Sequence, residues 1–67
     1  MEENKYKYII INVLSDEIVA KKSLRDISEF IKLIYPQESI SHNTISVYFR
    51  KKNYFYFNEL LIKQLIW

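Results

Sequence analysis

Residues 23–52, "SLRDISEFIKLIYPQESISHNTISVYFRKK", hold two stretches with the period of an amphipathic helix, separated by a proline. In the first stretch the apolar residues recur at helical spacing: Leu24, Ile27, Phe30, Ile31 and Ile34. Polar residues fall on the opposite side: Arg25, Ser28, Glu29 and Lys32. Ser23 is the expected N-cap, Asp26 favours the helix N-terminus, and Pro36 stops the helix near Tyr35.

Ser41 is the expected N-cap of a second helix. Ile40 and Ile45 occupy the two positions of a hydrophobic staple, so the sequence specifies the angle at which the chain enters this helix. The buried stripe is expected to consist of Ile45, Tyr48 and Phe49. On or near the open side we expect His42, Asn43, Ser46, Val47 and Arg50. The helix is expected to end at Asn53.

The flanking segments have strand character. "YKYIIINVL" (residues 6–14) and "IVAKK" (residues 18–22) predict a β-hairpin around the turn formers "SDE". "YFYFNELLIKQLIW" (residues 54–67) predicts a second hairpin that turns near Asn58 and Glu59. A C-terminal helix over "NELLIKQLIW" stays open as an alternative, because Glu, Leu, Lys and Gln are good helix formers. We expect one small α+β domain, residues 1–67, resembling a winged helix with the C-terminal hairpin as its wing.

The length of 67 residues limits the core. A chain this short buries only about 60% of the surface that its unfolded form exposes. No cysteine can staple it, while aromatic residues make up 16% of the chain, so a homodimer is a natural way to bury more apolar surface. No apolar run could span a bilayer and no signal peptide is recognisable, so the expected location is the cytoplasm, with no membrane partner.

The residues needed for familiar catalytic sites are missing. The chain has no Gly, which excludes Gly-rich phosphate loops and the nucleophile elbow, and one His without any Cys gives no triad or familiar zinc site. Asp16 and Glu17 are adjacent acids of the kind that solvated turns contain. We therefore expect no enzyme and no cofactor or metal.

The cations are placed unevenly, although the net charge is only +2. They form two groups: Lys21, Lys22 and Arg25, and Arg50, Lys51 and Lys52. No Asp or Glu lies between Ser39 and Phe57. Two helices, the second of them polar at its start and cationic at its end, have the organisation of a helix-turn-helix, whose second helix enters the major groove of DNA.

The polar and cationic residues of this second helix have roles in such a site. Asn43 is suited to read adenine, and His42, Thr44 or Ser46 to meet bases or phosphates. Arg50, Lys51 and Lys52 would lie beside the DNA backbone. The alternatives are that the cations only complement the helix dipole, that Thr44 serves the helix terminus, and that His42 is a surface or capping residue.

At "SLRDISEFI…ISHNTISVYF" the sequence resembles the nuclease-associated modular DNA-binding domains (NUMOD type) that stand beside homing endonucleases. The resemblance covers roughly Tyr8 to Ile62. It implies DNA contact from the second helix and a position near the backbone for the start of the first, through the following residues: Ser41, His42, Asn43, Thr44, Ser46, Arg50, Ser23 and Arg25. The connection "LIYPQES" is longer than the usual turn and lacks its Gly, and no nuclease core is present.

Two kinds of partner follow. The first is double-stranded DNA, read by the 41–52 helix of a small regulator or accessory factor, and a composition rich in Ile, Lys, Asn, Tyr and Phe suggests a phage, plasmid or viral origin. The second is a host protein bound through the aromatic hairpin around "NYFYF" (residues 53–57); RNA ranks third. An exposed patch of Tyr54, Tyr56 and Trp67 would favour the protein partner.

Overall fold

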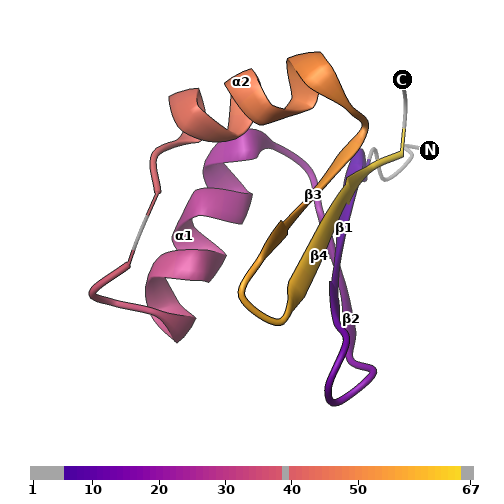
Figure 1. The fold of residues 1–67 in the computed structure, drawn as a ribbon, viewed down its shortest axis with the longest axis vertical. Coiled ribbons are helices and arrows are strands. Elements are labelled where there is room, and N and C mark those ends of the chain that lie inside the picture. Colours follow the sequence, from indigo (N-terminus) through magenta and orange to yellow (C-terminus); the bar gives the residue numbers. More distant parts are fainter. Residues whose placement is uncertain (1–5, 39, 66–67) are drawn as a thin grey trace, which may run out of the picture.

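The computed structural model describes residues 6–38 and 40–65, which form a four-stranded antiparallel sheet and two helices (Figure 1). The elements follow in the order β1 (Tyr8–Asn12), β2 (Ile18–Lys21), α1 (Leu24–Ile34), α2 (His42–Lys51), β3 (Tyr54–Phe57) and β4 (Leu60–Gln64). The predicted α+β layout, with a hairpin on each side of two helices, is confirmed. The strands of the first hairpin are shorter than predicted.

The order of strands in the sheet is β2-β1-β4-β3. β4 therefore lies between β1 and β3, and Ile62 is opposite Ile10 on one side and Phe55 on the other. The C-terminal hairpin is thus an integral half of the sheet. Because it does not extend from the helices as a separate ribbon, the structure does not confirm the winged-helix arrangement.

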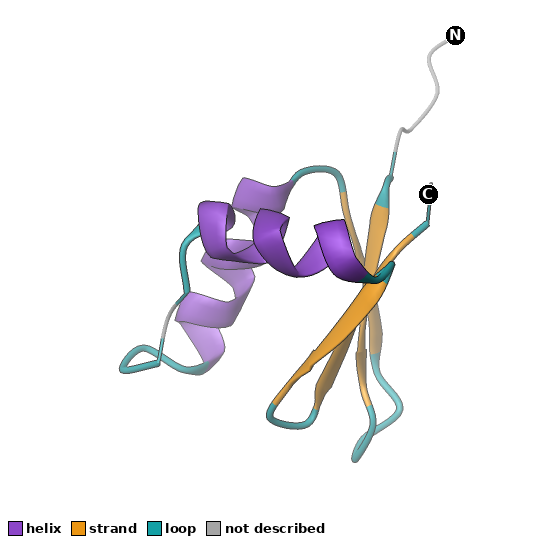
Figure 2. Cartoon of the chain, turned by 45° about the horizontal axis from the view of Figure 1, so that its top comes forward, coloured by secondary structure: helices purple, strands orange, loops and turns teal. Residues whose placement is uncertain are grey.

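Both helices lie on one face of the sheet, and none of the residues that the structure describes forms a layer over the other face (Figure 2). Successive side chains of a strand point to opposite faces, so the partners of the core residues Ile10 and Ile62 share the helix side. The remaining strand residues form what we call the open face: Ile9, Ile11, Ile18, Ala20, Tyr54, Tyr56, Leu61 and Lys63.

The core between sheet and helices is small and apolar. Its buried members are Ile10, Ile27, Ile31, Ile45, Phe49, Leu60 and Ile62. Aromatic rings close it near α2, where Phe49 stacks on Tyr8 with 5.5 Å between centroids and meets Phe55 edge-on at 5.4 Å. Such pairs add about 0.5–1.5 kcal/mol each beyond the burial of their area.

The ends of the helices follow the sequence closely. The Ser23 hydroxyl accepts a hydrogen bond from the backbone N–H of Asp26 at 3.2 Å, and α1 ends before Tyr35 and Pro36, as predicted. The Ser41 hydroxyl accepts from the backbone N–H of Thr44 at 3.3 Å. α2 ends at Lys51 with Lys52 as its C-cap, directly before Asn53, which was predicted to end the helix.

Three side chains lie where the sequence did not place them, the first of which is Ile34, predicted on the apolar side of α1 but 40% exposed. Tyr48, predicted in the buried stripe, is 40% exposed because it sits at the flank of α2, where its ring packs on Phe55 at 4.8 Å. Ser28, predicted on the solvated side of α1, is half-buried and donates a hydrogen bond to the carbonyl of Ile40 at 2.6 Å.

The second hairpin turns at Asn58 and Glu59, as predicted. Asn58 has a positive φ of 56°, a conformation that Asn tolerates better than most residues, and it directs the chain back as β4. The alternative of a C-terminal helix is therefore wrong over Leu60–Gln64, while Ile66 and Trp67 lie outside the described residues. Within residues 6–38 and 40–65, neither helix has the length and apolarity to cross a bilayer.

Candidate nucleic-acid interface

The solvent side of α2 is set by the two residues that it buries. Ile45 and Phe49 point into the core, and with a step of 100° per residue Asn43, Val47 and Lys51 lie furthest from it. All three are exposed, as is the neighbouring Arg50. We call Asn43, Ser46, Val47, Arg50 and Lys51 the outer stripe of α2; Ser46 is half-buried at its edge.

Three of the predicted site residues have structural tasks. The hydroxyls of Ser41 and Thr44 lie 3.2 Å apart at the start of α2, where Ser41 also caps the helix. The Ser23 hydroxyl caps the start of α1 in the same way. His42 is half-buried, so of the first turn only Asn43 presents its side chain fully to solvent.

Val47 is a member of the outer stripe that sequence reasoning left out of the site. It is 44% exposed and lies at the centre of the stripe, between Asn43 and Lys51. The signal was present in the sequence: position 47 is opposite the Ile45–Phe49 side of the helical wheel. An apolar side chain there is suited to contact the methyl group of a thymine.

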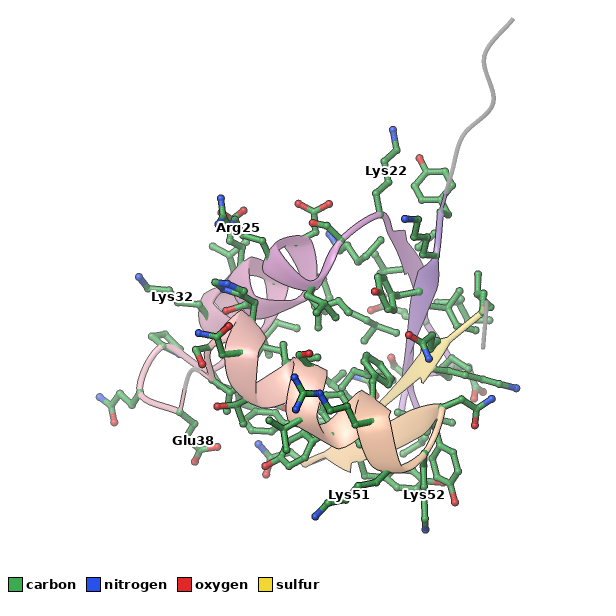
Figure 3. All side chains as sticks on the ribbon, turned by 90° about the horizontal axis from the view of Figure 1, so that it is seen from above. Lys22, Arg25, Lys32, Glu38, Lys51 and Lys52 are labelled. Atoms are coloured by element: carbon green, nitrogen blue, oxygen red, sulfur yellow. The ribbon has the colours of Figure 1, made fainter. Side chains whose placement is uncertain are left out.

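Cationic side chains flank α2 on two sides. Figure 3 shows Lys22 and Arg25 beyond one side of the helix and Lys51 and Lys52 at the other, all directed away from the core. Lys22 and Lys52 each lie over a tyrosine ring, with Nζ 5.4 Å from the ring centroid. Asp26, in the first turn of α1, is the acid nearest in sequence to these cations and is half-buried.

Several acids lie at the opposite end of the molecule. Asp16, Glu17 and Glu59 belong to the two hairpin turns, which lie at the ends of the strands remote from α2 (Figure 1). Among the described residues the charge is therefore polarised along the strands, with cations gathered around α2. An anionic ligand is attracted to the α2 end and repelled from the turns.

A shallow hollow of about 280 Å³ opens beside α2. Its lining consists of Tyr8, Leu24, Ser46, Phe49, Arg50 and Gln64. It offers a guanidinium, an amide and a hydroxyl beside aromatic surface, which suits hydrogen bonding rather than acid-base chemistry. Within the described part of the chain no three His, Cys, Asp or Glu side chains come together to hold a metal ion.

The connection between the helices is fastened at several points, which fixes the placement of α2. Ser28 holds the carbonyl of Ile40 directly before the helix. The Asn58 amide donates to the Glu38 carboxylate at 2.9 Å, and Tyr35 packs edge-on against Phe57 with 5.6 Å between centroids. The hairpin turn thus supports the long connection that replaces the usual tight turn.

Tyr35 also interacts with Glu59 in that turn. Its buried hydroxyl meets no partner at full hydrogen-bond geometry among the described residues. Interaction with the nearby Glu59 carboxylate, together with burial, nevertheless raises the pKa of Tyr35 to about 12. The same contact holds the pKa of Glu59 below its usual value.

The tyrosines of β3 lie away from the outer stripe of α2. Tyr54 and Tyr56 belong to the open face, where Tyr56 is 62% exposed and the two rings are 6.1 Å apart. Trp67, the third member of the predicted patch, lies outside the described residues. Exposed Tyr54 and Tyr56 are the outcome that was expected to favour a protein partner.

No family model, no curated protein and no solved structure matches this chain.

Proposed function

We propose that this protein binds duplex DNA with α2 in the major groove. The observation that supports this most directly is the outer stripe, whose neutral and cationic side chains project from a helix flanked by cations on both sides. The helix contains no acid, so it presents nothing that repels phosphate.

The dimensions of the groove suit this helix. The major groove of B-DNA is about 12 Å wide and admits an α-helix. Asn43 and Ser46 are short, which allows close approach in the part of the helix that would meet base edges. Asn43 is suited to a bidentate contact with adenine, and Val47 to a neighbouring thymine methyl group.

The cations suit the two DNA backbones that border the groove. Lys51 and Lys52 lie on one side of α2, while Lys22 and Arg25 extend from the start of α1 on the other. Phosphate contacts of this kind fix the orientation of a protein on DNA without reading sequence. Base readout is thus assigned to Asn43, and orientation to the cations.

The resemblance to NUMOD-type domains supports the same assignment. The segments that carry the resemblance are the strand pair, the Ser-Leu-Arg helix and the Ile-Ser-x-x-Thr-Ile helix. We propose a freestanding, non-enzymatic binding module that acts in the cytoplasm as a regulator or accessory factor of a mobile element or phage.

The test is a fluorescence-anisotropy titration against a pool of random duplexes over a salt series. Wild type is expected to bind most tightly at low salt. Lys51→Ala or Lys52→Ala should lower the slope of log affinity against log salt by about 0.9 for each lost phosphate contact. Lys32→Ala, the same charge change in the last turn of α1, is the matched control and should leave the slope unchanged. Absence of binding by wild type to every duplex at low salt would rule the proposal out.

Binding of another protein is a second candidate function. It is favoured by the open face, where Ile18 and Tyr56 are 65% and 62% exposed. Such contiguous apolar surface on a soluble domain commonly marks an interaction site.

A further inference from the structure

We infer that the open face binds a second copy of this chain, in a dimer whose two-fold axis runs parallel to the strands between β1 and β4. Seven of the eight residues of the open face are apolar, and Lys63 is the one charged member. In Figure 2 this face of the sheet is bare, whereas the helices cover the other. Packing of sheet on sheet is the usual way to cover such a surface.

The strand register arranges the open face in two rows. The row nearer α2 reads Ala20, Ile9, Lys63 and Tyr54 across the sheet, from β2 to β3. The next row reads Ile18, Ile11, Leu61 and Tyr56. Each row therefore has a tyrosine at the β3 edge, and the row nearer α2 has its smallest residue, Ala20, at the β2 edge.

A two-fold axis along the strands places each row of one copy against the same row of the second copy, in reverse order. Ala20 then lies opposite Tyr54 of the second copy, so that the smallest side chain meets a large one. In the other row Ile18 lies opposite Tyr56 and Ile11 opposite Leu61, which are apolar pairs. Alternation of small and large residues across facing layers is what close packing requires.

The other two-fold axis in the plane of the sheet, perpendicular to the strands, gives poorer pairs. It would place Tyr54 against Tyr56 at one edge and Ala20 against Ile18 at the other, leaving excess volume on one side and a gap opposite. The volumes on the open face therefore favour the axis along the strands.

Lys63 is compatible with this dimer. Under the proposed axis it faces Ile9 of the second copy rather than another cation. It is one residue from the end of β4, so its aliphatic stem can cover Ile9 while the ammonium group reaches water at the end of the sheet. The open face contains no acid, and no charge is left buried between the sheets.

The area of the face sets the strength of the dimer. Four strands about 4.8 Å apart and four or five residues long cover roughly 300 Å² in projection. Accessible area exceeds projected area, so two copies would bury about 1,000 Å² in total, at the lower limit for a specific interface. We therefore expect a reversible dimer that dissociates on dilution. A core of seven buried residues gives this small domain a further reason to associate.

The proposed axis keeps both α2 helices at the same end of the dimer. Adding one sheet-to-sheet and two sheet-to-helix spacings of about 10 Å each puts the helices on the order of 30 Å apart. This is close to the roughly 34 Å between successive major grooves on one side of DNA. The match between the separation of the two α2 helices and that of the major grooves rests on the proposed DNA binding, whereas the dimer itself does not.

The test is sedimentation velocity without DNA, over a concentration series from micromolar to millimolar. Wild type should pass from the 8.2 kDa monomer to twice that mass. Ile18→Glu and Tyr56→Lys should each raise the dissociation constant at least tenfold. The double variant should restore dimerisation, because residue 18 of one copy then pairs with residue 56 of the other. Within one copy these positions lie on the opposite edge strands β2 and β3 and do not meet.

Leu33→Glu is the matched control, since Leu33 is 81% exposed on α1 and away from the open face. It should dimerise like wild type.

Circular dichroism confirms the folding of each variant. Should either single variant lose helix signal, Ala20→Glu combined with Tyr54→Lys repeats the test on the other row. A wild type that stays monomeric throughout overturns the dimer. Folded single variants that the double variant does not rescue overturn the axis. Both outcomes leave the DNA titration of the monomer intact.

Discussion

Position along α2 decides whether a polar side chain serves the helix or faces solvent. Ser41 and Thr44 are as suited to hydrogen bonding as Asn43, yet their hydroxyls satisfy the helix start and each other. Asn43 is free of that task because it points away from Ile45 and Phe49. The capping residues therefore affect stability, and in the proposed complex with DNA the readout of sequence depends on Asn43.

Asn43→Ala should cost about 1–3 kcal/mol of binding on the preferred duplex and relax the preference at the base pair that it contacts. The reason is the loss of a bidentate contact without the loss of a charge. The measurement is competition of specific and scrambled duplexes for each variant. Lys51→Ala serves as the contrast, since it should weaken all duplexes about equally; equal losses for both variants on every duplex would argue against readout by Asn43.

The contact between Tyr35 and Glu59 predicts a dependence of stability on pH. The pKa of Glu59 is lower in the folded chain than its ordinary value of 4.5, so the folded state favours the carboxylate. This contribution is present above pH 4.5 and is lost as the pH falls through the folded pKa. Tyr35→Phe removes the cause of the shift, and its melting temperature should fall less steeply than that of wild type in acid. If thermal melts showed that the melting temperatures of the two proteins fall equally steeply in acid, this would contradict the prediction.

At the scale of the elements, local signals located the helices and non-local pairing located the last strand. Ser23, Ser41 and Pro36 act on their immediate neighbours, so the helix ends could be predicted from the sequence to within one or two residues. For residues 58–67 helix and strand preferences were nearly balanced. The pairing of β4 with both β1 and β3 decides between them. Because β1 lies about fifty positions earlier in the sequence, this pairing leaves no mark on local periodicity.

The site was predicted in part for a related reason. Helical spacing identified Asn43, Ser46 and Arg50 on the open side, since it depends only on the period of α2. It could not show that Ser28 would be drawn under the connection to hold Ile40, because the path of residues 35–41 depends on the hairpin turn at Asn58.

The two sides of α2 should respond differently to truncation. Ile45→Ala should lower the free energy of unfolding by about 2–5 kcal/mol, since Ile45 is fully buried in a small core. Val47→Ala, two residues away on the outer stripe, should change it by less than about 0.5 kcal/mol. Urea unfolding followed by circular dichroism measures both. Similar values for the two variants would mean that α2 is rotated from its described orientation.

Ser28→Ala should destabilise the domain by about 1 kcal/mol, because the Ile40 carbonyl loses its partner in a half-buried position. Glu29→Ala is the control at the neighbouring, exposed position. The same urea titration measures the difference between the two, and a Ser28→Ala variant as stable as the control would show that the connection is held by its other contacts.

For the molecule as a whole, the proposed dimer links stability to concentration. Association of folded chains shifts the folding equilibrium by mass action. The melting temperature of wild type should therefore rise with protein concentration, whereas that of Ile18→Glu should not. Differential scanning calorimetry over a concentration series makes the comparison. A melting temperature of wild type that is independent of concentration would contradict the linkage.

The place of β4 in the sheet also bears on how the protein is made. β4 forms the bridge between β1, the first strand, and β3, and the backbone of Leu65 donates to Lys7 at 2.7 Å. While the ribosome is still adding residues 60–64, β1 and β2 form an isolated hairpin and the two helices have only half a sheet to pack on. A two-stranded hairpin is marginal by itself in water. The nascent chain therefore gains its cooperative fold only after β4 has left the exit tunnel.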